Sequence, residues 1–352
     1  MYLFEKATRA SFTKCDNTGR PMDLIDGLWA FNVLIISAGT ITTAYFVYTV
    51  RRCQSLHPNL RFYLIQIVIP LNFVGISRFF GFLNDHYKWF SHNSDYCILI
   101  GSLNVFSTGL GDCIMLAIVT ERSIATCQRS HYEHRNAGMA KIYCFFMVAY
   151  GVVYVGICWY CAGKLEEVFP QRCMILDRHP ILDALGFSMC GFFSFTCAPF
   201  MAYLYIYNQK LIANRQVMES LTSRFQVNEN VIVLKCFLPV FVICFAVYGG
   251  LGLSSIAASG IMSKVMENPD LWLLDALAHV SHIFVDSVCL TFEIIFMVCH
   301  PTIQSRVAKD LANWFPQIYP EDFLLREKQR KCVKEGIGNS DDYFNQYETL
   351  WK

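Results

Sequence analysis

The sequence predicts an all-α protein, a bundle of seven transmembrane helices followed by a short amphipathic helix. Of its 352 residues, 54% are hydrophobic and only 16% are charged, whereas about 25% of the residues in soluble domains carry a charge. Seven apolar runs are long enough to cross the hydrocarbon core, which needs about 20 residues of helix. A helical stripe of apolar residues then follows the seventh run. These three observations indicate that lipid is the solvent around most of the chain.

The seven runs follow one another with short polar connections between them. Their predicted bounds are 28–50, 62–83, 97–120, 142–163, 184–208, 236–260 and 271–299. The seventh run holds several ionisable residues, but its other residues are strongly apolar and its length is ample. We therefore predict four parts: an extracellular amino-terminal tail over 1–27, the transmembrane domain over 28–299, an amphipathic cytoplasmic helix over 300–315, and a partly disordered cytoplasmic tail over 316–352.

Two segments next to the predicted spans also carry helical patterns. Before the sixth run, Leu221, Phe225 and Ile232 recur at helical spacing, so this helix is expected to begin well before the apolar run. After the seventh run, Pro301 opens a segment whose apolar residues share one face of a helix. That face is formed by Ile303, Val307, Leu311 and Trp314, with Arg306 and Lys309 opposite. The second segment is expected to lie on the inner leaflet.

The charge of the connecting loops predicts the orientation. One set of alternate loops carries more than twice as many Lys and Arg residues as the other, and cytoplasmic loops are enriched in these residues. The amino terminus is then outside, although four basic residues in the amino-terminal tail argue mildly for the reverse. This orientation places Cys97 and Cys173 on the oxidising side, where a disulfide can persist. We predict that bridge, with two unpaired thiols as the alternative, and Cys15 stays unassigned.

Ionisable residues of the seventh run form a stripe. Asp275, His279, His282, Asp286 and Glu293 fall within a wedge of about 60° on a helix. Ionisable groups at bilayer depth are costly unless they face the bundle interior or a water-filled cavity. The stripe should therefore face inward.

Two ionisable residues of other runs, Arg78 and Asp112, are candidate partners of this stripe. In the functional interpretation, an outward-opening ligand cavity is lined by Arg78, Asp275, His279 and His282. A deeper switching network then contains Asp112, Asp286 and Glu293. The alternative is a purely structural polar cluster. His/Asp sets at helical spacing are common without metal, so we predict no metal site and no cofactor.

Glu121 and Arg122 stand at the predicted inner end of the third helix. Cys97 and Arg122 are separated by about 37 Å of helical rise, which spans the bilayer and part of an interface. Such a pair can hold the helix end closed and then release a guanidinium toward a partner. Alternatively, it anchors the helix at the interface. We group Arg224, which precedes the sixth run, with these coupling residues.

Several function classes lack support in the sequence. The net charge is +1 and no basic run contains interleaved aromatic residues, so no nucleic-acid partner is predicted. No HExxH string or pair of catalytic carboxylates on facing helices is present, and we predict no enzymatic activity.

Four strings resemble a known family, namely ERSIATCQRSHYE, LTSRFQVNEN, LHPNLR and DDYFNQYETLW. The chain resembles the nematode serpentine chemoreceptors of the alpha/beta/epsilon superfamily, with the epsilon class favoured, over residues 28–351. The resemblance implies a rhodopsin-like bundle in the plasma membrane, in the sensory cilia of chemosensory neurons. It also implies a small-molecule chemical cue as ligand and a heterotrimeric G protein as partner. Ser123 replaces the usual aromatic residue after Arg122, and no NPxxY string follows.

Two other functions are compatible with seven helices. A ligand-gated channel would have its amino terminus inside the cell, so the orientation separates it from a receptor. A proton-linked transporter could use the stripe of the seventh helix, but the sequence shows no inverted repeat. The sequence leaves open whether the protein forms a dimer.

Overall fold

The computed structural model describes residues 23–53, 56–128, 138–165, 167, 172–214, 221–251 and 271–314. Seven of its helices are long and apolar enough to cross a membrane, which confirms the predicted all-α bundle, and the described residues contain no strand. These helices are α2 (Asp23–Arg52), α3 (Pro58–Tyr87), α4 (Asp95–Cys127), α5 (Gly138–Ala162), α7 (Pro180–Ala213), α8 (Leu221–Cys244) and α10 (Leu271–Cys299).

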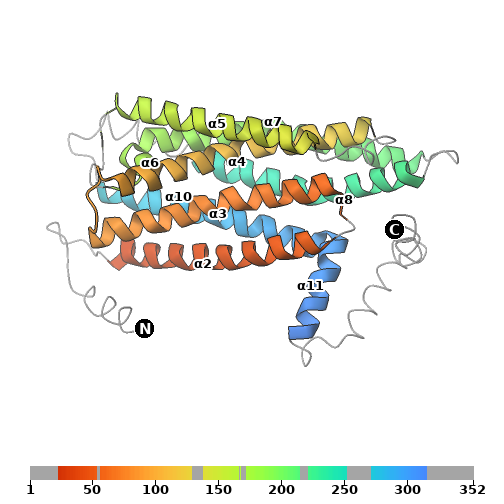
Figure 1. Ribbon diagram of the computed structural model, residues 1–352, viewed down its shortest axis with the longest axis horizontal. Helices are drawn as coiled ribbons and strands as arrows, with labels where there is room; N and C mark the ends of the chain where they lie inside the picture. Colours follow the sequence, from red (N-terminus) through yellow and green to blue (C-terminus); the bar gives the residue numbers. More distant parts are fainter. Residues whose placement is uncertain are drawn as a thin grey trace.

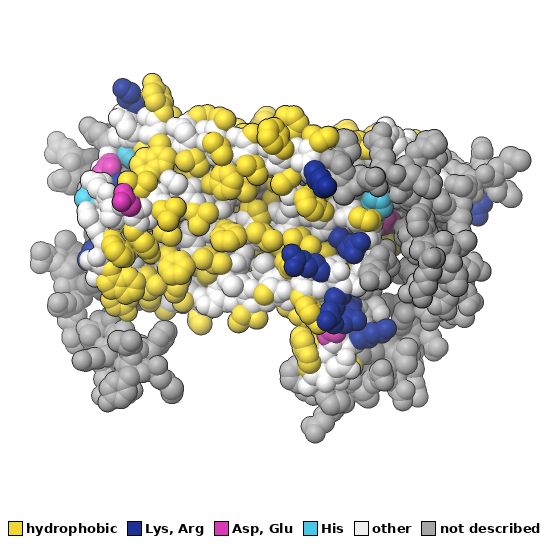
Figure 2. Space-filling model, viewed as in Figure 1, with side chains coloured by type: hydrophobic (Ala, Val, Ile, Leu, Met, Phe, Trp, Pro, Cys, Tyr) yellow, Lys and Arg dark blue, Asp and Glu magenta, His cyan; other side chains and the backbone are white. Residues whose placement is uncertain are grey.

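The seven long helices lie side by side along one axis (Figure 1). A four-residue helix, α6 (Ile175–Arg178), lies at one end of the bundle, and α11 (Pro301–Trp314) leaves the opposite end at a steep angle. Hydrophobic side chains cover the flank of the bundle seen in Figure 2, and the Lys and Arg side chains of that view gather toward the α11 end. This distribution suits helices whose sides contact lipid.

Most of the long helices begin before or end after the predicted apolar runs, because their polar ends continue the same hydrogen bonding, whereas α10 has the predicted bounds. The sixth helix begins at Leu221, as the helical spacing predicted, and a π-helical turn, η1 (Phe245–Gly249), follows α8 directly. The predicted run ended at residue 260, and residues 252–260 lie outside the described part. A π turn inserts one residue into the helical repeat and often occurs at a functional site.

Aromatic side chains fill the core at the α11 half of the bundle. The ring centroids of Phe237 on α8 and Phe296 on α10 are 4.8 Å apart, and those of Phe292 and Phe296 are also 4.8 Å apart. Phe46 of α2 meets both α10 rings edge-on. Such offset and edge-to-face contacts join three helices more strongly than their buried area alone.

The helix after the last span docks on α2. Ile303 of α11 is fully buried, and the ring of Trp314 lies 5.3 Å from that of Tyr45. On the same helix Arg306 pairs with Asp310 at 3.4 Å, one turn apart. The amphipathic stripe predicted from the sequence therefore packs partly against protein.

A glycine brings α7 against the π turn. A Cβ added at Gly191 would lie 2.8 Å from the backbone of Gly249, which is closer than two such atoms can approach. The close approach places Cys190 and Tyr248, the neighbours of these glycines, in the same cavity wall.

We expect Gly191→Ala to push α7 from η1 and to cost about 1–3 kcal/mol, the usual range for overpacking. Thermal unfolding of the purified protein measures the change. Gly156→Ala is the matched control, because a Cβ at Gly156 meets no atom within 4 Å. An unfolding midpoint in Gly191→Ala that equals that of the control would show that this contact can relax freely.

Candidate functional site

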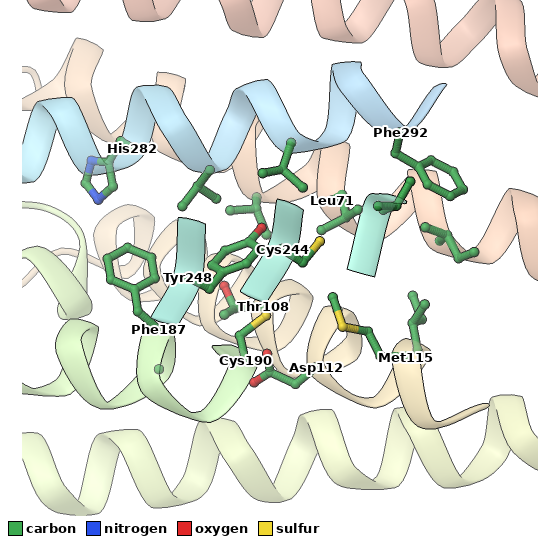
Figure 3. A pocket seen from close by; sticks show the side chains of 18 of the residues that line it. Leu71, Thr108, Asp112, Met115, Phe187, Cys190, Cys244, Tyr248, His282 and Phe292 are labelled. Carbon is green, nitrogen blue, oxygen red and sulfur yellow. The ribbon is translucent and has the colours of Figure 1, made fainter. Parts of the chain in front are cut away.

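A cavity lies inside the bundle between α3, α4, α7, α8 and α10, with α6 at its edge (Figure 3). Its walls are mostly apolar. About 80 Å³ of it is open to the centres of water-sized spheres, whereas one water needs roughly 10–15 Å³. The polar side chains that line it are Arg78, Asn104, Thr108, Asp112, Asp177, Asp183, Tyr248 and His282. An apolar hollow with a few polar groups is the usual form of a small-molecule site.

Arg78 and Asp286 form an ion pair across the bundle, from α3 to α10. The guanidinium Nη1 lies 3.0 and 2.9 Å from the two carboxylate oxygens, and each side chain is only 6% exposed. The sequence suggested Arg78 as a partner of the α10 stripe, but it placed Arg78 in the ligand cavity and Asp286 in the deeper switching network. Because each charge offsets the other, the pair adds little net charge to the cavity.

The two histidines of the α10 stripe face inward. His282 is buried, lines the cavity and has its Nε2 atom 3.6 Å from Asp177 of α6. His279 is also buried and packs its ring 5.0 Å from that of Phe82, outside the cavity lining. Asp275 lies in the first turns of α10, and its side chain is outside the described part.

Asp112 lies in the cavity wall at mid-length of α4. Its side chain is 1% exposed and is hydrogen-bonded with Cys190 of α7, which lies beside it in Figure 3. The sequence suggested that Asp112 meets the α10 stripe, whereas the structure places it against α7. The sequence analysis missed Asp183, one turn into α7, because it fell just before the predicted fifth run.

A disulfide holds the connection between α5 and α7 over one end of the bundle. Cys97 and Cys173 are bridged, as expected if this end faces the oxidising side. The backbone N–H of Cys173 donates to Asp85 at 2.7 Å, and a Cβ at Gly81 would meet Met174 at 2.7 Å. These contacts hold α6 in the position where its Leu176 and Asp177 line the cavity.

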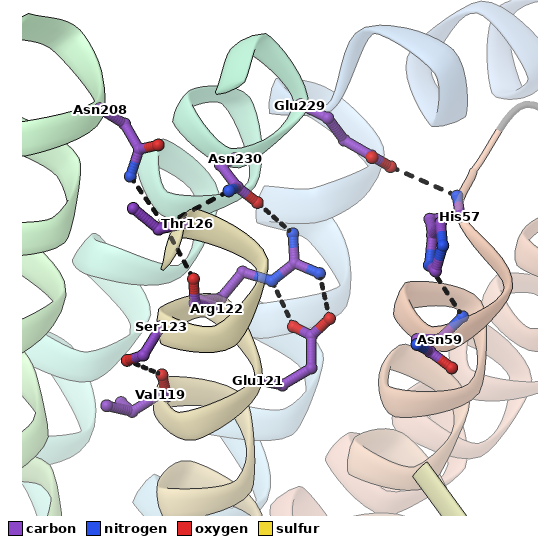
Figure 4. A network of polar contacts seen from close by, with 10 residues as sticks. All are labelled: His57, Asn59, Val119, Glu121, Arg122, Ser123, Thr126, Asn208, Glu229 and Asn230. Carbon is purple, nitrogen blue, oxygen red and sulfur yellow. Dashed lines mark hydrogen bonds and ion pairs between the residues drawn. The ribbon is translucent and has the colours of Figure 1, made fainter. Parts of the chain in front are cut away.

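A second polar network lies at the α11 end of the bundle (Figure 4). Arg122, fully buried, donates to both carboxylate oxygens of Glu121 and, through Nη1, to Asn230 of α8 at 2.9 Å. Asn230 donates to Thr126 at 3.3 Å, and Asn208 of α7 donates to the same hydroxyl at 3.0 Å. The network ties α4, α7 and α8 together.

Two histidines adjoin this network outside the spans. Burial, together with the positive charge of Arg122, lowers the pKa of both His57 and His300 to about 4. Both rings are therefore neutral at pH 7. The backbone N–H of His57 donates to Glu229 of α8 at 3.3 Å, which links the first connection to α8 (Figure 4).

The remaining predicted residues lie apart from both groups. Glu293 is fully buried and accepts a hydrogen bond from Thr43 of α2. It therefore joins α2 to α10 outside the lining of the cavity. Arg224 is half-buried in the first turns of α8. The α8 residue that contacts Arg122 is Asn230, which the sequence analysis did not select, and not Arg224. Within the described ranges, no group of three or more His, Cys, Asp or Glu side chains could hold a metal ion.

Comparison with known proteins gives the chain a family. Residues 24–311 match the family described as serpentine type 7TM GPCR receptor class ab chemoreceptors. The chain is 21% identical to serpentine receptor class alpha/beta-14 of Caenorhabditis elegans, over 91% of this chain and 88% of that protein. These matches support the alpha/beta family of the superfamily that the sequence resembles and do not confirm the favoured epsilon class. Because the match spans most of its length, the chain belongs to the serpentine class ab chemoreceptor family.

Proposed function

We propose that the protein is a chemosensory receptor that binds a small-molecule cue in the cavity and activates a heterotrimeric G protein at the α11 end. Membership of a receptor family, which is not a family of enzymes, supports a G-protein-coupled role. The seven apolar helices support a multi-pass membrane location. We place the protein in the plasma membrane, in the cilia of chemosensory neurons, because the family consists of chemoreceptors.

One observation carries this proposal: helices α4 and α8 contribute both to the cavity wall and to the Arg122 network, as does α7. Asp112 lines the cavity on α4, and Arg122 lies ten residues further along, about 15 Å of helical rise. On α8, Phe241 lines the cavity and Asn230 receives the Arg122 hydrogen bond. A ligand that moves α4 away from α8 would lengthen the Arg122–Asn230 hydrogen bond. Breaking this hydrogen bond would make the guanidinium of Arg122 available to a partner.

The proposed orientation places the amino terminus outside and the α11 end in the cytoplasm. The Lys and Arg residues in the loops support it, as does their gathering toward the α11 end in Figure 2. The Cys97–Cys173 bridge lies at the opposite end. Under this orientation α6 covers the extracellular mouth of the cavity, and Arg122 faces the G protein.

Epitope accessibility tests this orientation. One tag is placed before residue 28 and another after residue 351, and antibody binding is compared in intact and permeabilised cells. We expect the first tag to be exposed on intact cells and the second to require permeabilisation. The reverse result would overturn the receptor proposal and favour a ligand-gated channel with a cytoplasmic amino terminus.

A further inference from the structure

We propose that the ligand of the cavity is a small organic amine, bound in its protonated form by Asp112 with an apolar body along the remaining wall. This inference rests on the proposed function, because it names the class of cue that the receptor would recognise. It follows from the charges of the cavity, from the burial of Asp112 and from the apolar surface around it.

The cavity wall holds more carboxyl groups than cationic groups, with Asp112, Asp177 and Asp183 beside the single guanidinium of Arg78. Arg78 is offset by Asp286 at 2.9 Å, and Asp177 lies 3.6 Å from His282. The remaining carboxylates are those of Asp112 and Asp183. Neither forms an ion pair with a residue in the described part of the chain.

Of the two carboxyl groups, Asp112 is the one that would contact the bound ligand. It is 1% exposed, and its Oδ2 atom has no hydrogen-bond partner among the described residues. A buried carboxylate without a partner costs several kcal/mol unless it takes up a proton or meets a cation. A ligand ammonium would provide that cation and fill the acceptor that the thiol of Cys190 leaves open.

The rest of the wall suits a carbon skeleton better than a bare metal ion. The rings of Phe187 and Tyr248 line the same cavity as Asp112 and can contact an ammonium through their faces (Figure 3). No cluster of three or more candidate metal ligands occurs in the described ranges. A sodium or calcium ion would lack the six or so oxygen atoms that such ions require.

Asp183 would act earlier, as the cation approaches. It lies seven residues before Cys190 on α7, which corresponds to about 10 Å along the helix toward the α6 end. A carboxylate at this level raises the local concentration of cations near the mouth and steers them inward. The two carboxylates therefore predict unequal effects on binding, with the larger at Asp112.

The test uses the purified full-length chain and three probes that share a phenethyl body: phenethylamine, 2-phenylethanol and 3-phenylpropionate. At pH 7.4 the first is a cation, the second neutral and the third an anion. Binding is measured as the rise of the thermal unfolding midpoint with probe concentration. We expect phenethylamine alone to raise it.

Asp112→Asn should weaken the apparent affinity for phenethylamine at least about thirtyfold, the effect of removing one member of a buried charge pair. Asp183→Asn should weaken it only several-fold, and it provides the readout if Asp112→Asn does not fold. Asp310→Asn on α11 is the control, because it removes a buried carboxylate far from the cavity and should leave binding unchanged.

Three results would overturn the amine assignment: no stabilisation by phenethylamine, equal stabilisation by the alcohol or the acid, or an amine effect that both cavity variants retain. Each would leave the receptor proposal standing, because the tag experiment does not depend on the charge of the ligand. An inverted tag result with amine binding intact would instead reject the receptor and keep the site.

Discussion

Replacing Asp286 with Leu is expected to destabilise the folded bundle by about 3–5 kcal/mol, because Arg78 would remain buried without its partner. The two side chains belong to different helices, lie 2.9 Å apart and are each 6% exposed. Removing one member of such a pair leaves the other charge buried without its hydrogen-bonded counterion. Thermal unfolding in detergent and the fraction of protein at the cell surface both report the loss.

The double variant Arg78→Met with Asp286→Leu separates charge from packing. It removes both charges and keeps most of the buried volume, so it should recover most of the lost stability. The control is Arg306→Met, which breaks the Arg306–Asp310 pair of α11. Arg306 is 35% exposed there, and a pair of this kind contributes about 0–1 kcal/mol. A double variant no more stable than Asp286→Leu would show that the charge of Arg78 is not the cause.

The sequence predicted the inward face of α10 because that prediction depends on one helix alone. His282 and Glu293 share a face of an α-helix, and lipid excludes ionisable groups from the outer face. Both residues are indeed buried. The spacing of these residues along one helix and the cost of ionisable groups in lipid were therefore sufficient to predict that they face the bundle interior.

Their partners were predicted less well, because partners depend on how neighbouring helices rotate and shift. Asp112 was a candidate partner of the α10 stripe, but it faces Cys190 of α7. The helix α6 was not predicted at all. Its four residues are too few for a periodic signal, and they are seated by the disulfide and by Asp85. Asn230 has no distinguishing pattern within its helix, and only packing brings it to Arg122.

Replacing Asn230 with Ala is expected to raise ligand-independent signalling roughly tenfold. Asn230 accepts from Arg122 at 2.9 Å and donates to Thr126 at 3.3 Å, so it joins α8 to α4. A hydrogen bond to a charged group contributes about 1.5–3 kcal/mol, and its loss would shift a two-state bundle toward the open form. Nucleotide exchange on co-expressed G proteins, scaled to receptor at the cell surface, measures the change.

Two further variants show whether the bond itself holds the inactive state. Asn230→Asp would place a carboxylate against the guanidinium, which strengthens the contact, and basal exchange should fall below that of the unmodified receptor. Asn228→Ala, on the same helix and half-buried, should leave it unchanged. Opposite shifts from Ala and Asp at one position cannot arise from a general loss of stability, because destabilisation would lower signalling in both. Equal basal exchange in all three variants would mean that the Arg122–Asn230 hydrogen bond does not hold α8 in the inactive state. The proposed link between the cavity and the G-protein face would then fail.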